Sequence, residues 1–251
     1  AASDVYKRQR RMKIRIKFCK DGVMKFIGHL DIMRYFQKAM RRAEIDICYS
    51  EGFSPHQIMS FAAPLGVGIT SEGEYLDIEV ASTRSSEASI QALNDTMVEG
   101  VRITGYVKLP DNAKTAMSLV AAADYELFFK DGYEAPAGMD EYREAIDHFY
   151  YETAEILITK QTKKSERVVD IKPLIYRFKV IEKNGKPAFF LKVSTGSNDN
   201  LKPELVLETL HKSMGLTLDE NAIQIHRLEI YAAGNEERTF VPLLAMGEEI
   251  R

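Results

Sequence analysis

The chain has 251 residues, of which 45% are hydrophobic and 28% are charged, and its formal net charge at pH 7 is −3. These values are typical of a globular protein with one large or two modest domains, and no apolar run reaches the roughly 18 residues of a membrane-spanning helix. Cys19 and Cys48, the only cysteines, are too few and too far apart for a disulfide scaffold or for a zinc or iron–sulfur site, so we expect no metal and no cofactor.

The first residues differ in character from those that follow. Residues 1–11 include "SDVYKRQ", which resembles a translated sequencing-adapter remnant, whereas Met12 opens a regular strand pattern. We therefore expect residues 1–11 to be a non-native leader. The start of the chain is polar and lacks the apolar segment of a secretory signal, so we expect a cytoplasmic protein without a membrane partner.

The pattern of residues 12–110 predicts a ferredoxin-like domain with the element order βαββαβ. "MKIRIKFCK" alternates apolar and basic residues, which is typical of a half-buried strand, and the next long segment repeats its apolar residues at helical spacing. The predicted elements are a strand over 12–20, a helix over 29–43, strands over 58–63 and 74–80, a helix over 85–100 and a strand over 101–109.

A similar element order recurs after a predicted linker over residues 111–122. Asn184-Gly185 marks a hairpin turn, and Pro203 lies where a helix begins. The predicted elements are a strand over 124–130, a helix over 138–152, a strand over 155–161, a hairpin over 170–196, a helix over 202–214 and a strand over 221–233. We expect an α+β protein with two tandem ferredoxin-like (βαββαβ) domains, 12–110 and 123–232, and a C-terminal tail over 233–251.

Basic residues are concentrated in two segments, although the net charge is negative. Residues 12–56 hold 9 Lys/Arg against 5 Asp/Glu, and residues 160–202 hold 11 against 4. Such segments either bind phosphate groups or keep exposed strands and helices soluble. The apolar positions of the predicted first helix gather on one side, so its cations face outward. The candidate RNA contacts, which we expect to share one groove, are Arg34, Lys38, Arg41, Arg42, Lys163, Lys164 and Arg167.

Two loops add further candidate contacts. In "YSEGFSPH" we expect Phe53, the candidate for base stacking, to pack partly against the preceding helix. His56 is expected to point into a concave surface with cationic residues, and a solvated turn histidine is the alternative. "TGSNDNLKPE" precedes a predicted helix N-terminus, which attracts anions, and a turn that only caps the helix is the alternative. The candidate anion contacts there are Ser197, Asn200 and Lys202.

Two histidines are the candidate catalytic groups. His29 begins the predicted first helix, and His56 lies in the loop that follows it. An imidazole at either position could accept the proton of a ribose 2′-hydroxyl. A helix over residues 29–43 spans about 21 Å, so a shared site requires the loop to fold back along the helix. Separate structural roles are the alternative.

Four spaced motifs resemble one known family. They are the "GHLD" element, the basic helix that ends in "RRA", the "YSEGFSPH" loop and "PLGVGITSEGEYLD", and "KKSERVVDIKPLIY" and "GSNDNLKPELVLETL" resemble later motifs of the same family. The chain is thus similar to the radical SAM-linked protein family, a domain of unknown function found beside or fused behind a cobalamin-type radical SAM protein. The resemblance implies a radical SAM protein as the partner. This chain lacks the closely spaced cysteines that hold a radical SAM cluster, so such chemistry would belong to the partner.

These observations favour a non-catalytic accessory protein that binds RNA, such as tRNA or rRNA, through basic faces and presents it to the radical SAM partner. The first alternative is a subunit that docks on the partner protein without contacting RNA. The second is a metal-independent endoribonuclease that uses His29 or His56, because tandem ferredoxin-like domains also occur in the CRISPR repeat-processing endoribonucleases.

Overall fold

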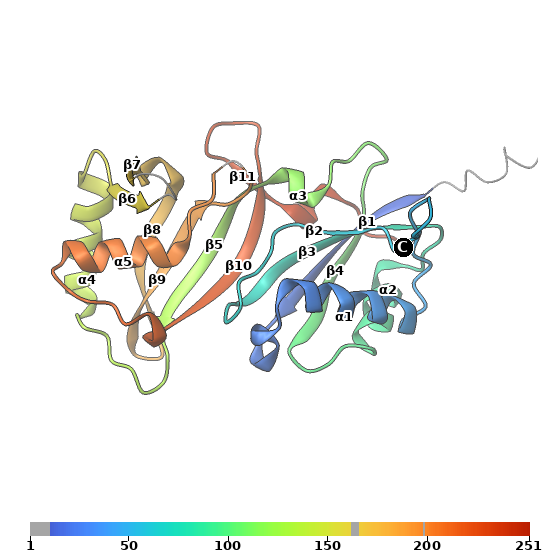
Figure 1. The fold of residues 1–251 in the computed structure, drawn as a ribbon, viewed down its shortest axis with the longest axis horizontal. Helices are drawn as coiled ribbons and strands as arrows, with labels where there is room; N and C mark the ends of the chain where they lie inside the picture. Colours follow the sequence, from blue (N-terminus) through green and yellow to red (C-terminus); the bar gives the residue numbers. More distant parts are fainter. Residues whose placement is uncertain (1–10, 162–165, 198) are drawn as a thin grey trace, which may run out of the picture. The chain divides into compact units, whose positions relative to one another are not determined.

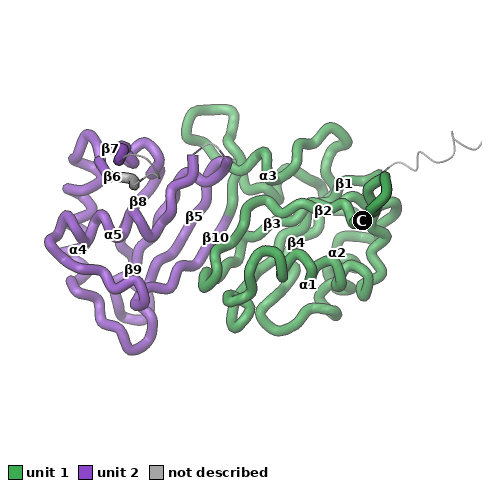
Figure 2. The backbone as a smooth tube through the Cα atoms, in the orientation of Figure 1, with its two compact units in different colours: residues 1–120, 230–251 green, residues 121–229 purple. Residues whose placement is uncertain are grey.

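The structure is a computed structural model that describes residues 11–161, 166–197 and 199–251. The chain forms two compact units, coloured green and purple in Figure 2. Unit 1 comprises Ala1–Val120 and Ile230–Arg251, and unit 2 comprises Ala121–Glu229. The boundary between residues 120 and 121 falls inside the predicted linker. The boundary between residues 229 and 230 differs from the prediction, because the residues expected to form a C-terminal tail belong to unit 1. Most of the predicted leader lies outside the described residues.

Unit 1 is built on an antiparallel sheet in which β1 lies between β3 and β4 (Figure 1). Ile16 of β1 is opposite Leu76 of β3 and Tyr106 of β4, and β2 also pairs with β3. The elements are β1 (Met12–Lys20), a 3-10 helix (Gly22–Phe26), α1 (His29–Arg42), β2 (Met59–Phe61), β3 (Thr70–Val80), α2 (Ser86–Asn94), β4 (Val101–Lys108), α3 (Ala116–Leu119), β11 (Phe240–Pro242) and a second 3-10 helix (Leu243–Met246).

The core of unit 1 lies between α1, α2 and one face of this sheet. Helical periodicity places Ile32, Phe36 and Met40 on one side of α1, where all three are buried. Phe36 packs against Phe18 of β1 with ring centroids 4.7 Å apart. Leu93 of α2 belongs to the same cluster. This packing determines which side of α1 faces the solvent.

The opposite face of the same sheet is covered by segments from far along the chain. Arg15 of β1 points to this face and donates from Nη1 to the carbonyl oxygen of Leu243, 3.1 Å away. The backbones of Lys108 and Glu248 bond to each other in both directions, at 2.8 and 2.9 Å. The predicted tail is therefore a structural part of unit 1, because its apolar Leu243 is completely buried.

Unit 2 contains a second antiparallel arrangement, in which β9 pairs with both β5 and β8. Its elements are β5 (Val120–Phe129), α4 (Met139–Ile146), a π-helical segment (Asp147–Glu152), β6 (Leu157–Gln161), β7 (Glu166–Asp170), a 3-10 helix (Lys172–Leu174), β8 (Ile175–Lys183), β9 (Lys186–Ser194), α5 (Pro203–Ser213), a 3-10 helix (Glu220–Ala222) and β10 (Ile223–Ala233), whose last residues are in unit 1. β10 lies beside β5.

The core of unit 2 lies between α4, α5 and one face of the strands (Figure 1). Tyr142 of α4 contacts Phe189 of β9, with ring centroids 4.8 Å apart, and His211 of α5 contacts the same ring at 6.2 Å. Phe178 of β8 completes the cluster with Phe189 at 6.3 Å. All of these side chains are buried.

The fold confirms the predicted α+β class and most predicted elements, but two predictions differ from the structure. The helix predicted over 138–152 changes to π-helical geometry at Asp147. The strand predicted over 155–161 pairs with β7 in a separate two-stranded sheet, and β7 was not predicted. The Asp170 carboxylate accepts from the backbone N–H groups of Ile156 and Lys172, which redirects the chain into β8. Within the described residues, none of the helices has both the length and the apolar character that spanning a bilayer requires.

Candidate nucleic-acid interface

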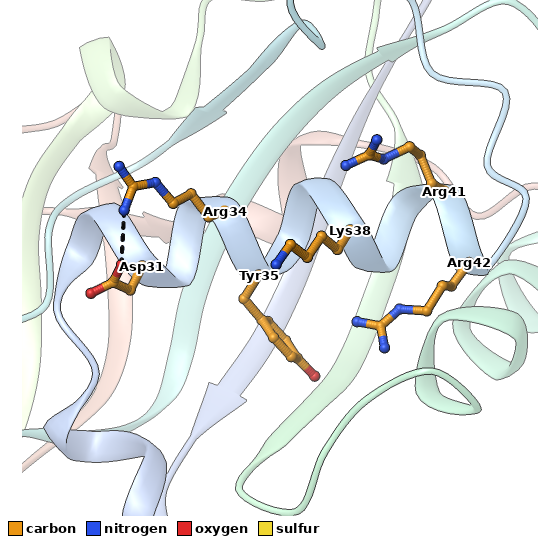
Figure 3. A pocket seen from close by; sticks show the side chains of 6 residues that line it. All are labelled: Asp31, Arg34, Tyr35, Lys38, Arg41 and Arg42. Atoms are coloured by element: carbon orange, nitrogen blue, oxygen red, sulfur yellow. Dashed lines mark hydrogen bonds and ion pairs between the residues drawn. The ribbon is translucent and has the colours of Figure 1, made fainter.

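The outward side of α1 carries all four cations predicted from the helical pattern. Arg34, Lys38, Arg41 and Arg42 are exposed, and together with Asp31 and Tyr35 they line a shallow depression (Figure 3). Arg34 forms an ion pair with Asp31 at 3.2 Å, and both side chains are about two-thirds exposed. In the part of the chain that the structure describes, the other three cations have no carboxylate within ion-pair distance. The positive charge of this face is therefore largely uncompensated.

The "YSEGFSPH" loop lies against the same helix. Its base is closed by a bridge between Tyr49 and Gln57. The side-chain amide of Gln57 donates to the carbonyl oxygen of Gln37 in α1 at 3.2 Å, and Arg41 Nε donates to the same oxygen at 3.4 Å. The loop and the cationic side of α1 therefore meet at one backbone carbonyl. We call the four cations of α1 together with residues 49–57 the α1–loop surface.

Phe53 lies at the tip of this loop and does not pack against the helix as predicted. Its relative exposure is 112%, so the ring projects entirely into solvent. The N–H of Ser50 donates to the carbonyl oxygen of His56 at 2.8 Å, which closes the loop before its tip can reach α1. Gly52, with φ of 108°, turns the chain there as only glycine does readily. The structure therefore presents an unpacked aromatic ring at the tip of a loop whose base contacts the cationic helix.

His56 is exposed, which corrects the prediction that it points into a concave surface. Its Nδ1 lies 2.9 Å from the hydroxyl of Ser50, and that hydroxyl also accepts from the backbone N–H of His56 at 3.1 Å. These contacts are local to the loop. They match the alternative, in which His56 is a solvated turn residue that stabilises the loop geometry.

His29 has a different environment from His56. It begins α1, is half-buried, and contacts Phe61 of β2 with ring centroids 5.3 Å apart. Along with Lys20 and Glu74, it lines a small cavity at this end of unit 1. No hydrogen bond or ring contact between His29 and His56 occurs among the described residues. The two histidines therefore have separate surroundings, and His29 borders a cavity.

The cavity beside His29 contains polar residues that sequence reasoning missed. Lys20 and Glu74 are only 2% and 3% exposed. The Lys20 ammonium donates to the carbonyl oxygen of Ile27 at 2.7 Å, and the Ser71 hydroxyl donates to the Glu74 carboxylate at 2.6 Å. Burying charged groups requires such partners. Ser71 and Glu74 belong to the "TSEGEYLD" part of a motif already noted, which was a usable signal.

The candidate residues of unit 2 are only partly described. Arg167 is exposed on β7, whereas Lys163 and Lys164 lie outside the described residues. Ser197, Asn200 and Lys202 are exposed ahead of α5, and the Ser194 hydroxyl donates to the carbonyl oxygen of Asp199 at 2.9 Å. Lys202 caps α5 without a side-chain bond, and Pro203 removes one of the free N–H donors that an anion would use. The predicted anion site and the shared groove remain predictions.

Comparison with known proteins gives one family and distant structural likenesses. A family model described as "Uncharacterized protein conserved in bacteria (DUF2344)" matches residues 13–203. No curated protein matches the chain. Among solved structures, one match is a chain from the "Crystal Structure of a Cbf5-Nop10-Gar1 Complex", with 11% sequence identity and a TM-score of 0.46. The match covers 86% of this chain and 48% of the other, so this chain spans about half the length of that protein.

Proposed function

The chain belongs to the DUF2344 family of uncharacterized bacterial proteins, and we propose that it is a non-catalytic accessory protein that binds single-stranded RNA through the α1–loop surface. The single observation that supports this function most is the exposed, largely unpaired row of cations on α1, whose Arg41 bonds to the same backbone carbonyl as the base of the loop that carries the fully exposed Phe53 ring. Proteins that bind single strands combine a cationic surface for the backbone with aromatic rings on which bases stack.

The arrangement of the cations suits a nucleic-acid backbone. Arg34, Lys38 and Arg41 follow one another at intervals of four and three residues, so they form a row along α1 about 10 Å long. A row of this kind can contact successive phosphates, and long basic side chains adapt to a flexible strand. Phe53 and the half-exposed Tyr49 would then meet the bases at the end of the row near Arg41.

We also propose that each unit is a ferredoxin-like domain. In unit 1 the strand order β4-β1-β3, with β2 also on β3, follows the element order βαββαβ. In unit 2, β10, β5, β9 and β8 follow in the same relative order, with β6 and β7 as an insertion after α4. In domains of this kind the two helices pack on one face of the sheet, and the other face is a common surface for RNA; in unit 1 that other face is covered by the C-terminal segment.

A second candidate function is docking on a protein partner, for which we propose the radical SAM protein implied by the sequence motifs. The supporting observation is a group of exposed apolar side chains near the N-terminus of α1. Val23, Phe26, Leu30 and Val67 are 63–76% exposed, and the N–H of Gly68 donates to the carbonyl oxygen of Lys25, which brings their two segments together. Exposed apolar groups of this kind are typical of protein contacts.

The test measures binding of a fluorescein-labelled oligouridine at several salt concentrations. We expect the slope of log affinity against log salt to flatten by about two when Arg34, Lys38 and Arg41 are all replaced by Ala, at about 0.7 per phosphate contact. The control replaces Arg102, Lys108 and Lys114, three exposed cations of the same unit, by Ala, so that the change in net charge is identical.

Phe53→Ala should lower the affinity by about 1–3 kcal/mol if a base stacks on the ring. Equal losses in the α1 variant and in the control would show that only net charge matters, which contradicts the proposed surface. Absence of RNA binding, combined with salt-independent capture of the radical SAM protein, would support the docking function. Metal-independent cleavage of the oligonucleotide that is lost in His29→Ala would instead support the nuclease.

A further inference from the structure

The strands of unit 2 have a second face, opposite the one that α4 and α5 cover. In β9, Phe189 points to the helices, so Phe190 points to the other side. In β5, Leu127 is opposite Phe189, and Phe128 therefore lies on the same side as Phe190. Glu126 is the direct partner of Phe190, which makes Phe128 and Phe190 diagonal neighbours about 7–8 Å apart across the two strands. Both rings are only half-buried.

Basic side chains surround these two rings. Lys183 Nζ lies 4.1 Å from the centroid of Phe128. Lys179 Nζ and the guanidinium carbon of Arg177 lie 5.2 and 5.7 Å from the centroid of Phe190. Lys192 of β9 is 3.5 Å from Asp124, and Lys183 is 2.5 Å from Glu126. Four cations against two carboxylates leave this face with a net positive charge.

We propose that this face of unit 2 is a stacking platform for single-stranded RNA, with Phe128 and Phe190 as the base-stacking rings. The inference deepens the proposed function and rests on RNA being the ligand, but it assigns a surface other than the α1–loop surface. Aromatic side chains on the two neighbouring strands of an open sheet are the feature by which four-stranded RNA-binding sheets hold successive bases. We call the surface formed by Phe128, Phe190, Arg177, Lys179 and Lys183 the β5–β9 platform.

The shape of the platform and the cations over its rings favour a single strand as the ligand. A flat sheet face cannot enter the narrow major groove of an RNA duplex, whereas unpaired bases can lie on its rings. The cations already occupy positions over the rings, held by attraction to the π faces. When a base stacks on Phe190, Arg177 can stack on the base in turn or contact a phosphate, so the positive charge remains next to the RNA.

Charge complementarity favours RNA over an apolar protein partner on this face. Arg177 and Lys179 are exposed and the structure gives them no ion pair within the described residues, so a partner without negative charge would leave them uncompensated. A phosphate backbone supplies that charge at regular intervals. Aromatic rings alone would be compatible with a protein contact, but rings combined with unpaired cations match the chemistry of a single-stranded nucleic acid.

The test uses an oligouridine that carries 5-iodouridine, which cross-links to stacked aromatic residues under ultraviolet light. We expect cross-linked peptides from β5 and β9, mapped by mass spectrometry to Phe128 and Phe190. The double variant Phe128→Leu with Phe190→Leu keeps apolar side chains on the face and should weaken binding about 5- to 150-fold for each stacked base. The control is Tyr151→Leu, which changes an exposed ring in the π-helical segment of unit 2 and should leave the affinity unchanged.

The outcomes separate this inference from the proposed function. Unchanged affinity in the double variant, with no cross-link to β5 or β9, overturns the platform, even if the α1 variant loses binding and the proposed function stands. Loss of binding in the double variant together with cross-links to β5 or β9, while the α1 variant binds as before, supports the platform and contradicts the α1–loop surface. If the double variant fails to fold, as judged by circular dichroism, the cross-link map of the unmodified protein decides. Absence of RNA binding by the unmodified protein overturns both.

Discussion

The best-defined single interaction in unit 1 is a buried ion pair between Arg15 and Asp77. Two parallel hydrogen bonds join the guanidinium to the carboxylate, at 2.8 and 2.9 Å, and the Arg15 side chain has no exposed surface. Asp77 also accepts from the backbone N–H of Ala116 at 2.6 Å, and Arg15 donates to Leu243. The pair therefore connects β1 and β3 to two segments that lie far from them in sequence.

Arg15→Met should destabilise the protein strongly, because it leaves the Asp77 carboxylate without its partner in a largely buried position. We expect a loss of about 3–5 kcal/mol in the free energy of unfolding, measured by urea denaturation. The double variant Arg15→Met with Asp77→Leu should recover part of the loss, since neither charge then remains unpaired. A loss below about 1 kcal/mol in the single variant would place the pair in the class of exposed ion pairs.

His211 is the completely buried histidine of α5, and its hydrogen bonds define its protonation state. Nδ1 lies 2.8 Å from the carbonyl oxygen of Leu207 and must donate to it, so Nε2 accepts from the hydroxyl of Tyr142, also at 2.8 Å. Burial lowers the pKa of His211 from its ordinary value of 6.5. Burial also raises the pKa of Tyr142, which keeps its hydroxyl protonated as the donor. The neutral pair therefore belongs to the folded state.

This pair makes stability depend on pH on the acid side. Above pH 6.5 His211 is neutral in both states, and as the pH falls below this value only the unfolded chain takes up the proton. The free energy of unfolding should then fall by up to about 1.4 kcal/mol per pH unit until the folded pKa is reached. Urea midpoints between neutral and mildly acidic pH measure this slope, and His211→Gln should reduce it. An equal slope in the variant would assign the dependence to other groups.

At the scale of elements, the two sides of α1 have different surroundings. Its apolar side packs on the sheet of unit 1, and its cationic side is exposed and forms the surface that we propose for RNA. In contrast to α1, the C-terminal segment follows a path that requires close contact between its backbone and β4. A Cβ atom at Gly247 would lie 2.6 Å from Val107 Cγ2 and 2.9 Å from the carbonyl oxygen of Lys108.

Gly247→Ala should therefore destabilise unit 1 by about 1–3 kcal/mol, because a backbone oxygen of a strand cannot move away as a flexible side chain can. Thermal unfolding followed by circular dichroism measures the loss. Gly66→Ala is the matched control, since its nearest neighbour would be the end of the Ile69 side chain at 3.1 Å. Equal effects of both substitutions would contradict the close approach at β4.

At the scale of the whole molecule, the residues that follow unit 2 in the sequence belong to unit 1. Ile230–Arg251 belongs to the first unit, where Leu243 is buried and the carbonyl oxygen of Ile250 accepts from the N–H of Ser86 at 2.8 Å. Unit 1 is thus completed by residues that follow unit 2 in the sequence. Its stability should depend on the end of the chain.

Removal of residues 234–251 should expose one face of the unit 1 sheet and leave Arg15 without its Leu243 acceptor. We expect hydrogen exchange of β1 and β4 amides to accelerate, while amides of β9 in unit 2 keep most of their protection. A synthetic peptide with residues 234–251, added in excess, should restore protection in β1. Unchanged exchange in β1 after the truncation would show that the segment does not stabilise unit 1.

The local elements were predictable because their causes are local. Helical periodicity placed α1 over 29–43, and the structure has His29–Arg42, with the predicted cations exposed. Alternation identified β1 and β4 nearly to the residue. In contrast, the position of Phe53 depends on how the loop closes between Ser50 and His56, and Glu74 is buried because Ser71 and its surroundings accommodate its carboxylate. Neither follows from residue type.

By itself, the sequence determined the α+β class, the order of the main elements and the cationic side of α1. These features follow from periodicity and composition over a few consecutive residues. Only the tertiary structure decided that residues 230–251 complete unit 1, that His29 and His56 have separate surroundings, and that Phe128 and Phe190 lie together among lysines and an arginine. The physical reason is that strand register and long-range burial arise from contacts between residues far apart in the chain, and no short pattern records them.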